Sequence, residues 1–257
     1  MKMRESKVLN RLREGRPVFS LKVNTKDTRV VEMMAMHGVE CIWTCAEHVA
    51  NDWGVIESQI LAAKAYDADT VVRVPRGSYS DYIRPLELDA AGIMVPHIMS
   101  AEDARRVAEM TRFYPIGKRP VDGGNADGRY CAIPAAEYNE QANRNRFVIV
   151  QIEDPEAVEE LDGICEVPGI DMVFFGPGDY SHRLGVSGQL DHPEVCRVRE
   201  LVARKAREHG IYAGTVAGPA TADEYLRMGY QFLNLGSDVA AMLQYMTGIR
   251  EFLDRHR

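Results

Sequence analysis

A regular alternation of short apolar segments with amphipathic segments constrains this chain more than any other feature. The apolar segments have the length of strands, and those between them carry apolar residues at helical spacing. The strand candidates are residues 17–23, 39–44, 70–75 and 92–96, followed by four that begin at Phe147, Met172, Ile211 and Phe232. The helix candidates are residues 4–14, 28–36, 55–65, 82–88, 101–112, 155–163, 193–208, 221–228 and 240–253. About eight strands alternating with helices predict an α/β protein, a single (β/α)8 TIM barrel over residues 1–257.

The segment Phe147–Asp154 shows how these strands end. Its near-continuous apolar run predicts a strand that is buried on both faces, as is usual in parallel sheets. Gln151 and Glu153 follow, two residues apart and therefore on one side of the strand. A doubly wound open sheet would share the alternation, but no G-x-G-x-x-G motif follows the first strand candidate to support a dinucleotide site.

The segment from Tyr114 to Asn145 breaks the alternation. It is rich in glycine, asparagine and proline, and it contains no clear core strand. Long loops inside a compact domain are usually functional. We therefore expect this segment to have a role in ligand recognition.

Composition and charge limit the partners of the chain. A net charge of -7 disfavours nucleic acid as a general partner. The five cysteines include no C-x-x-C pair, which predicts reduced thiols rather than a disulfide framework or a zinc site. No apolar run approaches a membrane span, and the first residues lack the apolar core of a signal peptide. We expect a soluble cytoplasmic protein that binds neither nucleic acid nor membrane.

Polar residues gather at the ends of four strand candidates. His48 follows the second strand, Arg73 ends the third, Glu153 ends the fifth and Asp179 follows the sixth. In a barrel the carboxyl ends of all strands meet at one rim, where active sites lie. A base, a cation and two carboxylates therefore converge there, and the two acids are suited to hold one divalent cation between them.

Each of these residues also has a structural interpretation. His48 alone is typical of an exposed loop, and Arg73 alone of a structural ion pair. Glu153 and Asp179 are also suited to cap the helices that follow them, and Gln151 to hold a loop. No single motif is sufficient for the catalytic interpretation. The convergence of these residues on one rim is the stronger evidence for it.

Several short motifs occur in a fixed order along the chain. They are Glu47-His48, Val71-Val72-Arg73, Gly92-Ile93-Met94-Val95-Pro96, Val150-Gln151-Ile152-Glu153, Gly176-Pro177-Gly178-Asp179-Tyr180-Ser181 and Leu235-Gly236-Ser237-Asp238. In order and spacing they resemble the HpcH/HpaI aldolase family, the class II pyruvate aldolases typified by 4-hydroxy-2-oxoheptane-1,7-dioate aldolase. The resemblance covers nearly the whole chain. It implies a carbon–carbon lyase that reversibly cleaves a 4-hydroxy-2-oxo acid to pyruvate and an aldehyde.

The resemblance also implies a metal site and an oxo-acid site. Glu153 and Asp179 would ligate a divalent metal (Mg, Mn or Co), with water and substrate completing its shell. Arg73 would face the keto oxygen, while Gln151 and the backbone N–H groups around Gly178 would help to bind the oxo-acid. A hard cation with oxygen ligands is suited to stabilise an enolate as charge develops on it.

By the same resemblance His48 is the acid and base on the aldol hydroxyl, a task that suits an imidazole near neutral pH. A carboxylate after the third strand pairs with this histidine in the family, sometimes from a neighbouring subunit, and Glu87 is the matching position. The family forms homo-oligomers, often hexamers built as trimers of dimers with exchanged C-terminal helices. The apolar residues of segment 240–253 are compatible with such exchange and equally with packing on their own barrel.

Two departures from the family concern the second substrate. The family's Asp-x-Glu-His begins here with Cys45, and its Arg-Gly is here Arg119-Pro120, before the glycine-rich residues 122–128. We expect this loop near the mouth of the barrel, where it would help to recognise the acceptor. Both changes leave the predicted metal and enolate residues in place.

Two other functions stay open. One keeps the fold and the enolate chemistry but uses oxaloacetate, by decarboxylation or by a citrate-forming condensation without metal. The other is a non-catalytic barrel that binds an oxo-acid. The presence of His48, Arg73, Glu153 and Asp179 argues against a decayed site.

Overall fold

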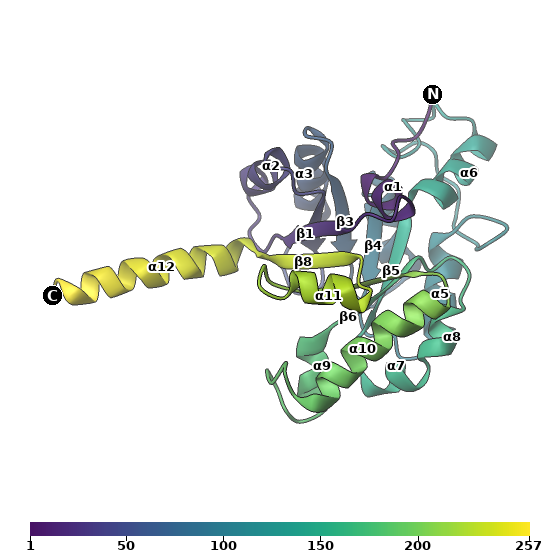
Figure 1. Ribbon diagram of the computed structural model, residues 1–257. Coiled ribbons are helices and arrows are strands. Elements are labelled where there is room, and N and C mark those ends of the chain that lie inside the picture. Colours follow the sequence, from purple (N-terminus) through teal and green to yellow (C-terminus); the bar gives the residue numbers. More distant parts are fainter.

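Figure 1 shows the computed structural model, which describes all 257 residues. The eight predicted strands close into one parallel barrel. The strands are β1 (Val18–Lys22), β2 (Cys41–Cys45), β3 (Asp69–Arg73), β4 (Gly92–Val95), β5 (Phe147–Ile152), β6 (Met172–Phe175), β7 (Tyr212–Val216) and β8 (Phe232–Ser237). Each strand pairs in parallel with the next one in the chain, and β8 pairs with β1. Every residue of β2, β3 and β5 is buried, because helices cover the outer face. The predicted TIM barrel is confirmed.

The predicted helices occur in the predicted order, together with others. They are α1 (Lys7–Arg13), α2 (Thr28–Met36), α3 (Trp53–Lys64), α4 (Tyr79–Glu87), α5 (Ala101–Thr111), α6 (Ala135–Asn145), α7 (Pro155–Glu159), α8 (Leu161–Cys165), α9 (Pro177–Arg183), α10 (Pro193–Glu208), α11 (Ala222–Met228) and α12 (Asp238–Arg255). Their starts agree with sequence signals. The side chains of Asp27 and Ser100 cap α2 and α5 by accepting backbone N–H bonds.

Side chains fill the inside of the barrel. Trp43 and Phe174 meet edge to face with ring centroids 5.5 Å apart, and Phe174 meets Phe232 at 6.3 Å. A Cβ at Gly214 would come within 2.7 Å of the Phe174 ring, so glycine makes room for it. Because side chains fill the interior, the place for a ligand is the rim of the barrel, at the carboxyl ends of the strands.

Three local features differ from the prediction. The second half of the predicted loop 114–145 forms α6, which buries Tyr138 against Phe113 with ring centroids 5.2 Å apart. The short helix α9, with Pro177 in its first turn, was not among the helix candidates. The helix expected over 155–163 is interrupted at Glu160, which ends α7 and precedes α8. Tertiary packing of Tyr138 stabilises α6. The helices α7, α8 and α9 have only five to seven residues, too few for a clear helical periodicity in the sequence.

The loop that precedes α6 lies on the amino-terminal side of the barrel. It connects α5 to β5, and such connections lie opposite the rim. Arg129 Nε donates to the carbonyl of Lys2 at 3.4 Å, and the Asp127 N–H donates to the carbonyl of Glu87 at 3.3 Å. Within one chain, the expectation that residues 122–128 lie near the mouth is therefore wrong.

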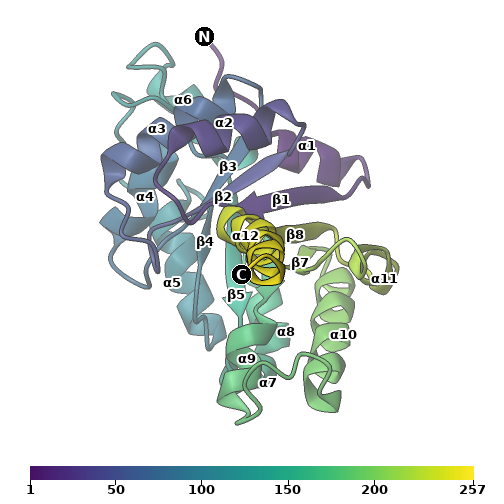
Figure 2. The same cartoon turned by 90° about the vertical axis from the view of Figure 1, so that its left-hand side faces the viewer.

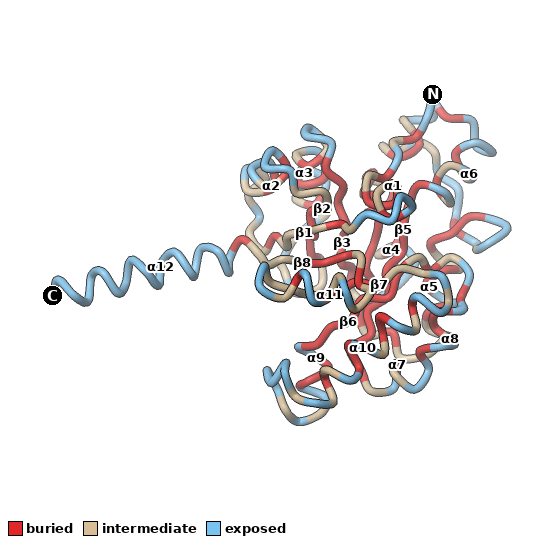
Figure 3. The backbone as a smooth tube through the Cα atoms, in the orientation of Figure 1, coloured by how far each residue is buried: buried red, intermediate tan, exposed pale blue.

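The last helix, α12, leaves the barrel and contacts little else. Figures 1 and 2 show it projecting beyond the carboxyl end of β8, on the opposite side from α6 and the N-terminus. Only Asp238 in its first turn is buried, and Figure 3 shows the rest as exposed. Its exposed apolar residues are Val239, Met242, Leu243, Tyr245, Met246, Ile249, Phe252 and Leu253. No helix of the chain combines the length and apolar character needed to cross a membrane.

Candidate active site

Arg73 occupies the centre of the rim. It ends β3 directly beside Cys45 of β2, and its side chain is only 7% exposed. Its Nη1 donates to Gln151 Oε1 at 3.5 Å and its Nη2 to Cys45 Sγ at 3.4 Å, while its guanidinium carbon lies 5.0 Å from the centroid of the Trp43 ring. Partners on β2 and β5 thus hold a buried cation in one orientation at the carboxyl ends of the strands.

Glu47 supplies the counter-charge of Arg73. Glu47 Oε2 lies 2.8 Å from Arg73 Nε, but the two buried atoms are not aligned for a hydrogen bond. The pair therefore holds the guanidinium by opposite charge, and both of these atoms are shielded from solvent. Sequence reasoning placed Glu47 in a motif but gave it no role, because its distance from Arg73 depends on how β2 and β3 pair.

Cys45 takes part in the same arrangement. Its sulfur accepts from the backbone N–H of His48 at 3.5 Å as well as from Arg73. Burial alone would raise the pKa of the Cys45 thiol, but the Arg73 charge and these N–H donors lower it. Cys45 stands where the family resemblance implies an aspartate, and here its sulfur is the acceptor of these N–H groups.

Glu153 follows β5 and is buried beside Gln151. Its Oε1 accepts from the backbone N–H of His97 at 2.9 Å, and its Oε2 accepts from Gln151 Nε2 at 3.2 Å. A Cβ at Gly176 would lie 2.6 Å from Glu153 Oε2, so only glycine leaves the carboxylate this position. His97 has a φ of 51° and pairs with Asp154 at 2.9 Å, which fixes the segment that supports Glu153.

The surroundings of Glu153 fit a bound cation. Burial raises the pKa of Glu153 to about 7, and the Asp179 carboxylate adds to this rise, against the N–H and the charge of His97 and the charge of Arg73. A divalent cation would supply the positive charge that two such carboxylates need. No group of three or more His, Cys, Asp or Glu side chains is placed to hold a metal. Two carboxylates suffice for a Mg²⁺-type ion whose remaining ligands are water and substrate.

Asp179 and Gly178 lie in the first turn of α9, and both are exposed at the rim. The first N–H groups of a helix have no partner within it and point outward. The carbonyl of Gly178 accepts from Ser181 Oγ at 2.7 Å, which holds the turn in place. This turn therefore presents a carboxylate and backbone donors beside Glu153.

His48 and Glu87 do not meet within one chain. His48 is at the rim, with its side chain 59% exposed and its Nε2 3.7 Å from Glu47 Oε2. Glu87 ends α4 on the amino-terminal side, where Arg119 Nη2 lies 3.9 Å away, and burial raises the pKa of Glu87. No ion pair joins Glu87 to His48, so any contact between them requires a second copy of the chain.

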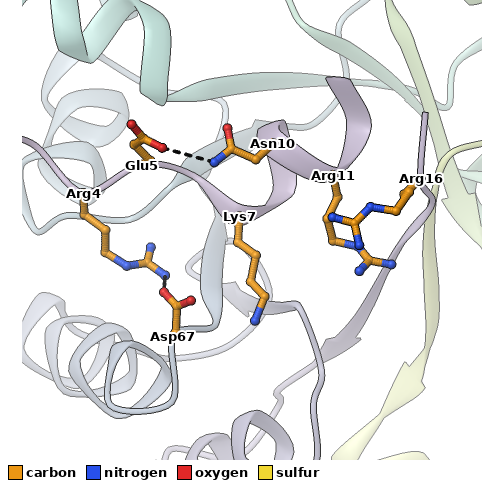
Figure 4. Close-up of a pocket in the computed structure, with 7 residues that line it drawn as sticks. All are labelled: Arg4, Glu5, Lys7, Asn10, Arg11, Arg16 and Asp67. Atoms are coloured by element: carbon orange, nitrogen blue, oxygen red, sulfur yellow. Dashed lines mark hydrogen bonds and ion pairs between the residues drawn. The ribbon is translucent and has the colours of Figure 1, made fainter. Parts of the chain in front are cut away.

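Two cavities of similar volume lie on opposite sides of the barrel. One of about 470 Å³ opens at the rim and is lined by Lys22, Asn24, Trp43, Val216, Ala217, Asn234, Gly236, Ser237, Val239 and Ala240. The other, of about 410 Å³, is lined by Arg4, Glu5, Lys7, Asn10, Arg11, Arg16 and Asp67 around α1 (Figure 4). Because α1 precedes β1, this second cavity lies on the amino-terminal side, away from the predicted site. Arg4 pairs there with Asp67 at 3.1 Å, and Arg11 pairs with Glu40 at 3.2 Å.

Comparisons with known proteins agree with the fold and with the family that the sequence resembles. A sequence profile described as HpcH/HpaI aldolase/citrate lyase matches residues 28–244. The 2-keto-3-deoxy-L-rhamnonate aldolase of Salmonella gallinarum is 34% identical over 229 residues, which are 88% of this chain and 85% of that protein. The protein of the same name from Klebsiella pneumoniae is 34% identical over 235 residues, 91% of this chain and 87% of its own.

Solved structures are similar over almost the full length. The HpcH/HpaI aldolase from Desulfitobacterium hafniense superimposes with a TM-score of 0.90 at 30% identity, covering 96% of both chains. The citrate synthase SbnG superimposes with a TM-score of 0.88 at 26% identity, covering 96% of this chain and 97% of that one.

Proposed function

This chain belongs to the HpcH/HpaI aldolase/citrate lyase family and is a carbon–carbon lyase of the aldolase type, and we propose that its active site is the rim cluster around Arg73 and Glu153. The proposed reaction is the reversible cleavage of a 4-hydroxy-2-oxo acid to pyruvate and an aldehyde. The observation that carries this assignment is the buried Glu153 carboxylate beside Asp179, with the fixed Arg73 cation joined to it through Gln151.

Glu153 and Asp179 are the proposed ligands of a divalent cation, Mg²⁺, Mn²⁺ or Co²⁺. The chemistry that such a cation supplies when bound is Lewis-acid polarisation of the substrate's keto oxygen. Glu153 is positioned by bonds from His97 and Gln151, and the open side of Gly176 leaves room for its carboxylate. These contacts fix the carboxylate before any ligand arrives, so little reorganisation is needed on binding.

Arg73 and the first turn of α9 are the proposed oxo-acid binding groups. The Nη1 and Nη2 groups of Arg73 carry further N–H donors beyond those bonded to Gln151 and Cys45, and these are suited to the keto oxygen as negative charge develops there. The guanidinium stays charged and is held by Gln151 and Cys45, so it acts as a fixed donor. The free N–H groups around Gly178 are suited to the substrate carboxylate.

His48 is the proposed acid and base on the aldol hydroxyl. Its ring is exposed at the rim, where it can reach a substrate and exchange its proton with water, and Glu47 lies beside it. In the cleavage direction the ring takes the proton of the 4-hydroxyl as the carbon–carbon bond breaks. In the reverse direction it returns that proton to the new alkoxide.

We also propose that the chain works as a homo-oligomer, a hexamer built as a trimer of dimers. The apolar side chains of α12 are exposed in one chain and would be buried against a second copy. Glu87 and the loop at residues 122–128 lie away from their own rim, so they can serve a rim only across a subunit interface. There Glu87 would pair with His48 of the neighbouring copy.

A second candidate function uses oxaloacetate, by decarboxylation or by condensation. The similarity to a solved citrate synthase favours keeping it. Both functions share an enolate, so metal dependence and product identity separate them.

The test is pyruvate release, followed by coupling to lactate dehydrogenase. The substrates are several 4-hydroxy-2-oxo acids and oxaloacetate, with EDTA and then with added Mg²⁺ or Mn²⁺. We expect release from a hydroxy-oxo acid that EDTA abolishes and the metal restores. Release from oxaloacetate alone, above its spontaneous rate, would favour decarboxylation. No release from any substrate would contradict both aldol cleavage and decarboxylation and would favour condensation or a binding role.

A further inference from the structure

The rim cavity of about 470 Å³ lies directly beside the proposed oxo-acid site. Its wall includes Trp43, and Arg73 lies 5.0 Å from the centroid of that ring. Lys22 ends β1 and pairs in register with Trp43 on one side and with Ser237 on the other. Its Nζ lies 5.5 Å from the same ring centroid. Lys22 is therefore the cation of the cavity, and Arg73 the cation of the neighbouring site.

The ammonium of Lys22 has no counter-charge of its own. No carboxylate lies within 4.0 Å of it, and its side chain makes no hydrogen bond although it is half-buried. Glu47 is paired with Arg73. Asp238 accepts from the N–H groups of Asn24, Thr25 and Val239 and from the Thr25 hydroxyl. A half-buried cation whose nearby carboxylates are engaged elsewhere is suited to an anionic ligand group.

The rest of the wall is also suited to an anion. None of the lining residues is Asp or Glu. The Trp43 ring, against which Lys22 lies, forms part of the same wall. Val216 and Ala217 supply an apolar side. The cavity thus combines a cation with aromatic and apolar surface, which match an aliphatic chain that ends in an anionic group.

We propose that this cavity binds the aldehyde half of the substrate and that Lys22 selects an aldehyde whose far end carries a carboxylate or a phosphate. The inference rests on the proposed function, because the aldehyde must face the oxo-acid held at Arg73. A neutral aldehyde would leave Lys22 without a counter-charge. Lys22 is then a specificity-determining residue, and it takes no part in forming the enolate.

The test compares charged and neutral aldehydes in the condensation direction with pyruvate. The pairs are succinic semialdehyde with pentanal, for the carboxylate, and glyceraldehyde 3-phosphate with glyceraldehyde, for the phosphate. We expect kcat/KM to favour the charged member of one pair by about tenfold or more, and the pair that shows this identifies the anion. Lys22→Met should abolish that preference, whereas Lys22→Arg should keep most of it.

Two controls separate this inference from the proposed function. Lys26→Met removes the same charge from an exposed site on the next loop and should leave the preference unchanged. Exchange of pyruvate methyl protons in D2O reports enolate formation without any aldehyde, and Lys22→Met should retain it. If exchange persists but Lys22→Met keeps the preference, or the unmodified protein has none, the Lys22 assignment is wrong and the proposed function stands. If the unmodified protein shows no exchange, the proposed function is wrong, and so is the Lys22 assignment that rests on it.

A binding measurement gives a second readout. Butyrate carries the anionic end without a reactive aldehyde, and Trp43 lies beside Lys22. In a Trp53→Phe background, butyrate should change the Trp43 fluorescence saturably, and Lys22→Met should abolish that change. A change of equal size and midpoint in Lys22→Met would contradict the assignment.

Discussion

The side chains of Arg73 and Glu47 form a buried ion pair, 2.8 Å between Nε and Oε2, in which neither atom makes a hydrogen bond. Such a pair fixes the guanidinium by opposite charge, while Nη1 and Nη2 carry N–H donors beyond those bonded to Gln151 and Cys45. Glu47 follows β2 and Arg73 ends β3, so the pairing of β2 with β3 builds this arrangement.

Substituting Arg73 tests the fixed donor. Arg73→Lys keeps a charge but loses the planar group that reaches Gln151, Cys45 and Glu47 together. We expect kcat/KM for aldol cleavage to fall by about 100-fold, or ~2.7 kcal/mol of transition-state stabilisation. Arg76→Lys, at an exposed arginine just after β3, is the matched control and should retain activity. Full activity in Arg73→Lys would remove Arg73 from the site.

Gly176 offers a test that leaves every proposed ligand in place. Gly176→Ala puts a methyl group 2.6 Å from Glu153 Oε2, so the carboxylate must move. We expect the affinity for Mn²⁺, measured by titration calorimetry, to fall by roughly tenfold while the fold persists. Gly218→Ala is the control, because a Cβ there meets no atom within 4 Å. Equal affinities in the two variants would mean that Glu153 does not hold the metal.

His48 can be tested by comparing two reactions of one enzyme. Aldol cleavage requires removal of a hydroxyl proton, whereas decarboxylation of oxaloacetate does not. His48→Ala should therefore slow cleavage by about 100-fold and decarboxylation far less. Glu87→Gln should show the same pattern if it supports His48 across an interface. Equal losses in both reactions would contradict the role given to His48.

The exposed face of α12 predicts the oligomeric state. Met242→Glu combined with Met246→Glu places charge on apolar positions of α12, and should reduce the molar mass measured by light scattering. Gln244→Glu adds one charge to the same exposed helix and is the control. An unchanged mass in the double variant would show that these positions lie outside the interface.

The sequence was sufficient for the strand order and for Arg73, Glu153 and Asp179 at one rim, because periodicity and strand-end position are local properties. It was insufficient for α6, whose buried Tyr138 is held by the distant residues Asp127 and Arg119. Side-chain contacts between neighbouring strands could not be predicted from the sequence either. The lack of a counter-charge at Lys22, and the contact of Cys45 with Arg73, depend on side-chain positions that only the closed barrel defines.

The most direct measurement is the exchange of pyruvate methyl protons in D2O, followed by ¹H NMR with and without Mn²⁺. Manganese is removed by EDTA before each spectrum. The unmodified protein should exchange these protons only when the metal is present, because Glu153 and Asp179 are proposed to hold it. Glu153→Gln and Asp179→Asn should both lose exchange while keeping the circular dichroism of the folded chain. Metal-independent exchange, or full exchange in Asp179→Asn, would contradict the account.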